Sequence, residues 1–181
     1  MLSDIAILYD RLEEKKRTLL AKLGTYSDRQ LRFQPGPDKW SMLMVLEHII
    51  LGEQGVRRSY EELSHNPVRD RLEPGQMFEV VLEVLENDIP VEVPDPAAVP
   101  DGRSPLNALA ALWEKERKLL YRLLDSVNEE TAASVMFSHP AAGPMDAVRT
   151  LRLAVAHFDT HLRQINNISV PDEGNGREVK P

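Results

Sequence analysis

The sequence predicts an all-α fold, a four-helix bundle with a long crossover between its second and third helices. Four long segments carry apolar residues at helical spacing, and no segment shows convincing strand alternation. About 40 residues, 64–103, separate the second and third helical segments. A connection of this length is too long for a simple antiparallel turn, so the helices need not alternate in direction.

The first two helices are marked by their ends as well as by their apolar faces. The first is expected over about 2–23, where Gly24 ends it. The second is expected over about 42–63, with Ser41 as its N-cap. The inward faces are Ile5, Leu8, Leu12, Leu19 and Leu23 in the first helix, and Met44, Val45, His48, Ile49, Gly52 and Val56 in the second.

The third and fourth helices have similar signals. The third is expected over about 105–124, with Ser104 as the cap and Pro105 in the first helical position. The fourth is expected to start near Pro144, after Gly143, and to continue to about residue 168. The inward faces are Leu109, Leu112, Trp113, Leu119, Leu120 and Leu123 in the third helix, and Leu151, Ala154, Phe158, His161, Leu162, Ile165 and Ile168 in the fourth.

The long link and the C-terminal segment complete the predicted organisation. Within 64–103, the stretch MFEVVLEVL predicts a short helix, which a proline-rich stretch follows. Residues 170–181, VPDEGNGREVKP, are expected to form a flexible tail. The predicted domain is therefore a bundle over residues 1–169 followed by this tail.

Composition excludes several classes of function. The chain has 181 residues and no cysteine, so disulfides, cysteine zinc sites and thiol nucleophiles are excluded. The net charge of −7 argues against nucleic acid as a partner, and the basic cluster Lys15, Lys16 and Arg17 is expected to be a solvated helix face. With neither a signal peptide nor an apolar run long enough for a membrane span, we expect a cytoplasmic protein without a membrane partner.

Three histidines fall on the apolar faces of two helices. His157 and His161 are one turn apart, so their rings can point nitrogens at one ion. His48 lies on the inward face of the second helix, where Gly52 is expected to leave open space beside its ring. Three neutral imidazoles leave coordination positions for water or substrate, as in catalytic metal sites.

The pattern alone leaves two interpretations open, a metal-binding triad and three separately hydrogen-bonded core histidines. Pairs at this spacing also arise by chance, but a buried ring without a partner costs about 1–3 kcal/mol, which favours a common purpose. His65, at the end of the second helix, and His139, in a loop, have no spaced partner and are left out of the site.

Other catalytic motifs are missing. HFDTH is not the zinc-protease motif, because Phe158 stands where that motif has glutamate, and Asp159 points away from the histidine face. There is no nucleophile elbow and no glycine-rich phosphate loop. Catalytic residues beyond the triad are therefore unknown. Glu47 and Glu53 could support the ligands as hydrogen-bond partners, but a solvated helix face is the expectation for them, as it is for Glu114 and Glu116.

Two segments resemble the signature regions of the DinB-like (DinB/YfiT) superfamily. They are FQPGPDKWSMLMVLEHIILGEQ (33–54) and GPMDAVRTLRLAVAHFDTHLRQINNI (143–168). In that pattern a tryptophan and a cap open the second helix, a histidine follows within it, and the fourth helix carries H-x-x-x-H before a glutamine. The resemblance spans about residues 1–169 and implies the four-helix bundle with its crossover.

The resemblance also implies a site and a class of chemistry. It implies a divalent ion, with nickel, zinc, manganese or iron as candidates, held by His48, His157 and His161. It further implies a homodimer and, for some members, thiol S-transfer with a low-molecular-weight thiol. The expected function is therefore a metal-dependent enzyme with thiol S-transferase-like chemistry on a small electrophilic substrate. The alternatives are a metal-dependent hydrolase of a small amide or ester, and a non-catalytic metal- or ligand-binding stress-response bundle.

Overall fold

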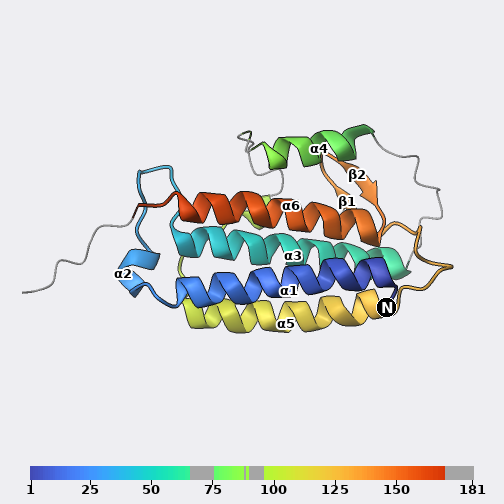
Figure 1. The fold of residues 1–181 in the computed structure, drawn as a ribbon. Helices are drawn as coiled ribbons and strands as arrows, with labels where there is room; N and C mark the ends of the chain where they lie inside the picture. The colour runs from blue at the N-terminus through green and yellow to red at the C-terminus, as the bar shows by residue number, and fades with distance from the viewer. Residues whose placement is uncertain (66–75, 88, 90–95, 170–181) are drawn as a thin grey trace, which may run out of the picture.

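The computed structural model describes residues 1–65, 76–87, 89 and 96–169, so the predicted tail at 170–181 lies outside the described residues. Four long helices form a bundle and confirm the predicted all-α class (Figure 1). These helices are α1 (Ser3–Leu23), α3 (Met42–His65), α5 (Leu106–Asp125) and α6 (Ala147–Asn166). The shorter elements are α2 (Asp28–Leu31), α4 (Gln76–Glu86), the 3-10 turn η1 (Pro96–Ala98) and the strands β1 (Phe137–His139) and β2 (Gly143–Met145).

The helix directions confirm the crossover. Helices α1 and α6 run one way along the bundle, and α3 and α5 run the other way (Figure 1). The N-terminal amine lies 3.0 Å from Asp125 at the end of α5, whereas Lys22 near the end of α1 bonds to Asn166 at the end of α6. Because α3 and α5 are parallel, the chain between them must return along the bundle. On this return path α4, the predicted short helix, packs against α6, and η1 contacts α3.

Two of the predicted helix starts are wrong. Helix α3 starts as expected, because the Ser41 hydroxyl accepts from the Met44 N–H at 3.3 Å. Helix α5 begins one residue late: Pro105 is extended, with ψ of 161°, and is itself the N-cap, so Ser104 has no capping role. Helix α6 begins at Ala147 rather than near Pro144, and Asp146 caps it by accepting from the Arg149 N–H at 2.8 Å.

The sequence prediction also missed a β-hairpin before α6. Strands β1 and β2 pair antiparallel, with Phe137 opposite Met145, and Gly143 has a positive φ of 76°. Each strand is three residues long, too short for a period of two to emerge from the sequence. The hairpin, α4 and α6 share a separate apolar cluster, whose buried members are Phe78, Leu82, Ala142, Met145 and Leu153.

The bundle interior contains charged side chains that were expected on the surface. Arg117 has a side chain that is 1% exposed, and it donates to both carboxylate oxygens of Glu53 at 2.6 and 2.7 Å. Glu53 also accepts from the indole N–H of Trp113 at 2.9 Å. Glu116 is likewise buried and accepts from Arg57 at 2.6 Å. The expectation of a solvated face is therefore wrong for Glu53 and Glu116, because partners on neighbouring helices compensate their burial.

The basic cluster on α1 is only partly solvated. Lys16 is buried and lies 2.8 Å from both Glu13 and Glu114, which contradicts the predicted solvated face at this position. Arg17 is exposed, as expected, and so is half of the Glu114 side chain. In the described part of the chain, no helix combines the length and the apolar character that a membrane crossing requires.

Candidate metal centre

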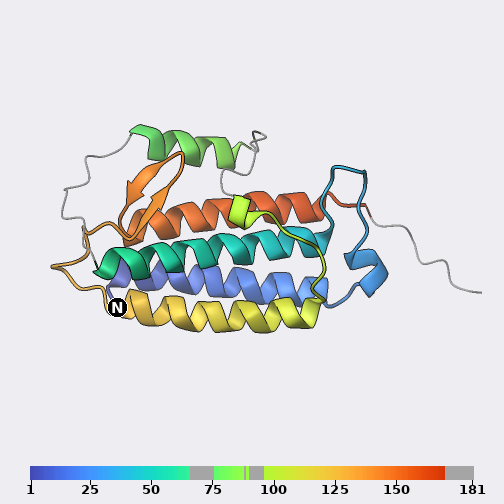
Figure 2. The same cartoon turned by 180° about the vertical axis from the view of Figure 1, so that it is seen from behind.

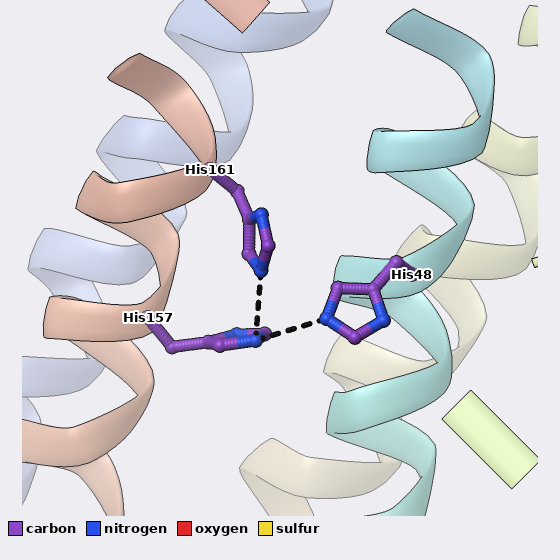
Figure 3. A group of neighbouring side chains, drawn as sticks. All are labelled: His48, His157 and His161. Atoms are coloured by element: carbon purple, nitrogen blue, oxygen red, sulfur yellow. Dashed lines mark hydrogen bonds between the residues drawn. The ribbon is translucent and has the colours of Figure 1, made fainter. Parts of the chain in front are cut away.

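The structure brings His48, His157 and His161 together between α3 and α6 (Figure 3). The Nε2 atom of His157 lies 3.1 Å from that of His48 and 3.0 Å from that of His161. The candidate ligand nitrogens of all three rings lie within 4.8 Å of one another. The predicted grouping therefore exists, and it excludes His139, which lies on β1. Nothing is described of the side chain of His65.

Each outer ring is held on the side that faces away from the cluster. The Nδ1–H of His48 donates to the carbonyl oxygen of Ala98 in η1 at 2.7 Å. The ring of His48 is also packed against Trp40, with centroids 4.9 Å apart. One turn from the end of α6, the Nδ1–H of His161 donates to Oε1 of Gln164 at 2.8 Å. The crossover and the last turn of α6 thus orient two of the three rings.

These outer hydrogen bonds fix the tautomers of the two rings. A carbonyl oxygen can only accept, so the proton of neutral His48 is on Nδ1 and its Nε2 carries a lone pair. With the amide of Gln164 oriented as it is, its Oε1 accepts from His161 in the same way, so the Nε2 of His161 also carries a lone pair. Both lone pairs therefore point toward Nε2 of His157. Outer partners of this kind orient metal-binding histidines in proteins.

The arrangement fits a metal ion better than it fits hydrogen bonding alone. Nε2 of His157 carries at most one proton, yet it faces two acceptor nitrogens. A cation between the rings would satisfy all three lone pairs at once. Two nitrogens bound to one ion at about 2.0–2.1 Å, with an angle of roughly 90–110°, lie about 2.9–3.4 Å apart. The separations of 3.0 and 3.1 Å from His157 fall in this range, whereas the three nitrogens together spread over up to 4.8 Å, more than the roughly 4.2 Å that two such bonds can span. His48 and His161 would therefore move closer to bind one ion, and ion binding by the triad stays a prediction.

Burial keeps the three rings neutral. It lowers the pKa of His48, although the bond to the Ala98 carbonyl opposes the shift. It also lowers the pKa of His157 well below the usual value, with added repulsion from His161 and His48. For His161, burial and then repulsion from His48 lower the pKa to about 4. Neutral imidazole is the form that binds metal, so no proton has to leave these rings at pH 7.

Two details of the predicted site need correction. Gly52 lies against His157, because a Cβ at this position would meet Cε1 of that ring at 3.7 Å, so the expected open space beside His48 is not what this glycine provides. The sequence analysis also gave no role to Ala98 or Gln164. A backbone carbonyl leaves no sequence signal, whereas Gln164 follows His161 by three residues on one helix face and could have been found.

The carboxylates nearest in sequence to the triad are engaged elsewhere. Asp159 pairs with Lys15 on α1, away from the ring cluster, as predicted. Glu47 is not on a solvated face, because it accepts from the Gly102 N–H at 2.8 Å. Glu53 is held by Arg117. These three carboxylates therefore have fixed structural partners and are not poised as bases at the triad.

The comparison with protein families agrees with the fold. A family model described as the DinB superfamily matches residues 11–165, which include all three histidines. Comparisons with curated proteins and with solved structures gave no match. The match covers most of the 181 residues, and the chain therefore belongs to the DinB superfamily.

Proposed function

We propose that this protein is a divalent-metal-dependent enzyme that transfers a low-molecular-weight thiol to a small electrophilic substrate. His48, His157 and His161 would hold the ion, with nickel, zinc, manganese and iron as candidates. The observation that carries the proposal is the convergence of three neutral rings, two of them with tautomers fixed by outer hydrogen bonds. Three protein ligands leave coordination positions for substrate, which is the pattern of catalytic rather than structural sites.

The surroundings of the triad favour a thiol over water as the nucleophile. When bound, the ion supplies Lewis-acid chemistry, which lowers the pKa of a thiol or a water molecule. A free thiol has a pKa of about 8.5, against about 15.7 for water, so a thiol needs much less assistance. Since Asp159, Glu47 and Glu53 are engaged elsewhere, these carboxylates do not provide the general base that hydrolysis uses.

The chain's own contribution is to orient two of the three ligands by hydrogen bonds on their outer sides. Ala98 and Gln164 keep the Nε2 lone pairs of His48 and His161 directed toward His157 before any ligand arrives. Neutrality at pH 7 means that no proton has to be removed from these rings when the site is loaded. Ligands that are oriented in advance reduce the free energy that rearrangement costs when the site is formed.

Activity of untagged protein, loaded with each candidate ion, tests the proposal. Glutathione, bacillithiol and mycothiol are offered with monochlorobimane as the electrophile, and product fluorescence is measured. We expect turnover with at least one thiol, its loss together with the ion in His48→Ala, and its retention in the control Asp159→Asn, which alters a carboxylate facing away from the triad. Unchanged turnover in metal-free His48→Ala would refute the mechanism.

Two further measurements separate the other classes of function. Metal-dependent hydrolysis of p-nitrophenyl acetate, without any thiol-transfer activity, would indicate the hydrolase. A structural ion is indicated if chelation unfolds the protein, because metal binding then contributes directly to folding. Chelation that leaves the helical circular dichroism nearly unchanged agrees with a preformed catalytic site.

A further inference from the structure

His139, which the sequence analysis left out, is held in one orientation by the hairpin turn. Its Nδ1 accepts from the backbone N–H groups of Ala141 at 3.1 Å and Ala142 at 3.0 Å. Because these bonds use the Nδ1 lone pair, the neutral ring carries its proton on Nε2. Burial lowers the pKa of His139, so this ring is also neutral at pH 7. His139 therefore presents a fixed N–H donor.

The hairpin that carries this donor contacts both helices of the three-histidine centre, β1 against α3 and β2 against α6. Strand β1 and turn η1 both contact α3, and Figure 2 shows them one after the other along the bundle. Ala142 belongs to the apolar cluster against which Ala156 packs, and Ala156 directly precedes His157. In agreement with this proximity, a charge on His139 contributes to the lowered pKa of His157.

The Nε2–H group of His139 is available to a ligand. Within the described ranges, neither a side chain nor the backbone forms a hydrogen bond with this atom. Every fully buried side-chain nitrogen or oxygen in the same ranges has a partner, so Nε2 of His139 reaches solvent. On α3, a Cβ at Gly55 would meet nothing within 4 Å, and one at Gly52 would meet only the ring of His157. Gly55 therefore leaves open space on α3, whereas Gly52 is in contact with the ring of His157.

We propose that His139 donates a hydrogen bond from Nε2 to an acceptor atom of the small molecule bound at the three-histidine centre. This inference rests on the proposed function, because it requires an ion held by His48, His157 and His161. The donor is neutral and is already oriented by two backbone amides, so it can serve an oxygen, nitrogen or sulfur acceptor without reorganisation. His139 thereby selects small molecules that carry an acceptor beside the atom that reaches the ion.

Azide binding to the Co²⁺-loaded protein tests this role without any enzymatic activity. Azide has a terminal acceptor nitrogen, and its binding changes the visible absorption of Co²⁺. The informative variant is His139→Asn, because the amide oxygen of asparagine takes the place of Nδ1 and preserves the turn, whereas nothing replaces the Nε2 donor. The comparison variant is His139→Gln, whose longer amide returns a donor near the position of Nε2.

We expect azide to bind about two- to tenfold more weakly to His139→Asn than to the wild type, with binding partly restored in His139→Gln. The affinity for Co²⁺ should match in all three proteins, and the melting temperature of His139→Asn should match that of the wild type. Equal azide affinity in wild type and His139→Asn, or no azide binding by Co²⁺-loaded wild type, would overturn the role of His139 and leave the metal centre standing. A wild type that binds no Co²⁺ would overturn the proposed function and this inference together.

Discussion

Replacement of Gln164 by alanine is expected to weaken metal binding although all three ligands remain. Gln164 accepts from Nδ1–H of His161 at 2.8 Å, and this bond selects the tautomer that leaves Nε2 free. Without the acceptor, the neutral ring can place its proton on Nε2 and can rotate, and both changes compete with the ion. In Gln164→Glu a carboxylate keeps the acceptor, so this variant should bind the ion at least as well as the wild type.

The size of the effect follows from the role of such partners in other metal sites. Loss of an outer hydrogen bond costs about 10–100-fold in metal affinity, which corresponds to roughly 1.4–2.7 kcal/mol. Since ligand binding adds to the free energy of unfolding, the ion-induced rise in melting temperature should shrink by roughly 3–10 °C for a chain of this size. The assay is thermal unfolding of untagged protein with and without Zn²⁺, with competitive titration against a chelating dye for the affinity.

The melting temperatures with and without Zn²⁺ are compared within each variant, so any effect of the mutation on the stability of the metal-free fold cancels. Asn166→Ala serves as the control, because Asn166 lies on the same helix turn, is exposed, and bonds to Lys22 rather than to the triad. The reasoning about tautomers is refuted if Gln164→Ala shows the same ion-induced shift as Asn166→Ala. It is also refuted if Gln164→Glu loses affinity as strongly as Gln164→Ala.

Three other outcomes are expected. Elemental analysis of untagged protein should find near one equivalent of a divalent metal in the wild type and none in His161→Ala; an equal metal content would exclude the triad as the site. Glu53→Gln should lower the free energy of unfolding by about 3 kcal/mol in urea titrations, because Arg117 stays buried with less compensation; a change below about 0.5 kcal/mol would contradict the importance of this pair. Without metal, stability should rise with pH between about 4 and 6.5, because the pKa of His161 is about 4 in the folded chain and 6.5 is its ordinary value, so the unfolded chain binds the proton first. The slope in urea titrations should approach about 1 kcal/mol per pH unit for this ring and be smaller in His161→Gln.

The bundle was predictable because long helices repeat their signal several times. In α1, Ile5, Leu12 and Leu19 recur at helical spacing and all three are buried. The crossover was predictable from the number of residues alone. The start of α6 was not, because the hairpin that precedes it has strands of three residues, and Gly143 was interpreted as a helix boundary although it serves the turn. Short elements are stabilised mainly by tertiary contacts, and the periodicity of one segment does not reveal these contacts.

The candidate site was predictable to the extent that its groups lie on periodic helix faces. His48, His157 and His161 each interrupt an apolar face, so the pattern pointed to them and their grouping followed from the bundle. The carbonyl of Ala98 could not be predicted, because its contact with His48 depends on how the crossover returns to α3. His139 was left out of the predicted site because no second histidine lies at a suitable spacing from it. Its observed partners are backbone N–H groups of its own turn, which a pattern of side chains does not indicate.

The pairing of Glu53, which was expected on a solvated face, connects the fold of this protein with the chemistry of its candidate site. Glu53 follows His48 by five residues on α3, about 140° further round the helix, so helix geometry already turns this carboxylate away from the triad. Arg117 and Trp113 of α5 hold both of its oxygens. A single-helix pattern could not reveal this, because the compensating charge comes from a helix more than fifty residues away. The candidate centre is therefore formed by three nitrogens alone, and a centre of this kind without a neighbouring base suits a nucleophile that ionises easily, such as the thiol of the proposed function.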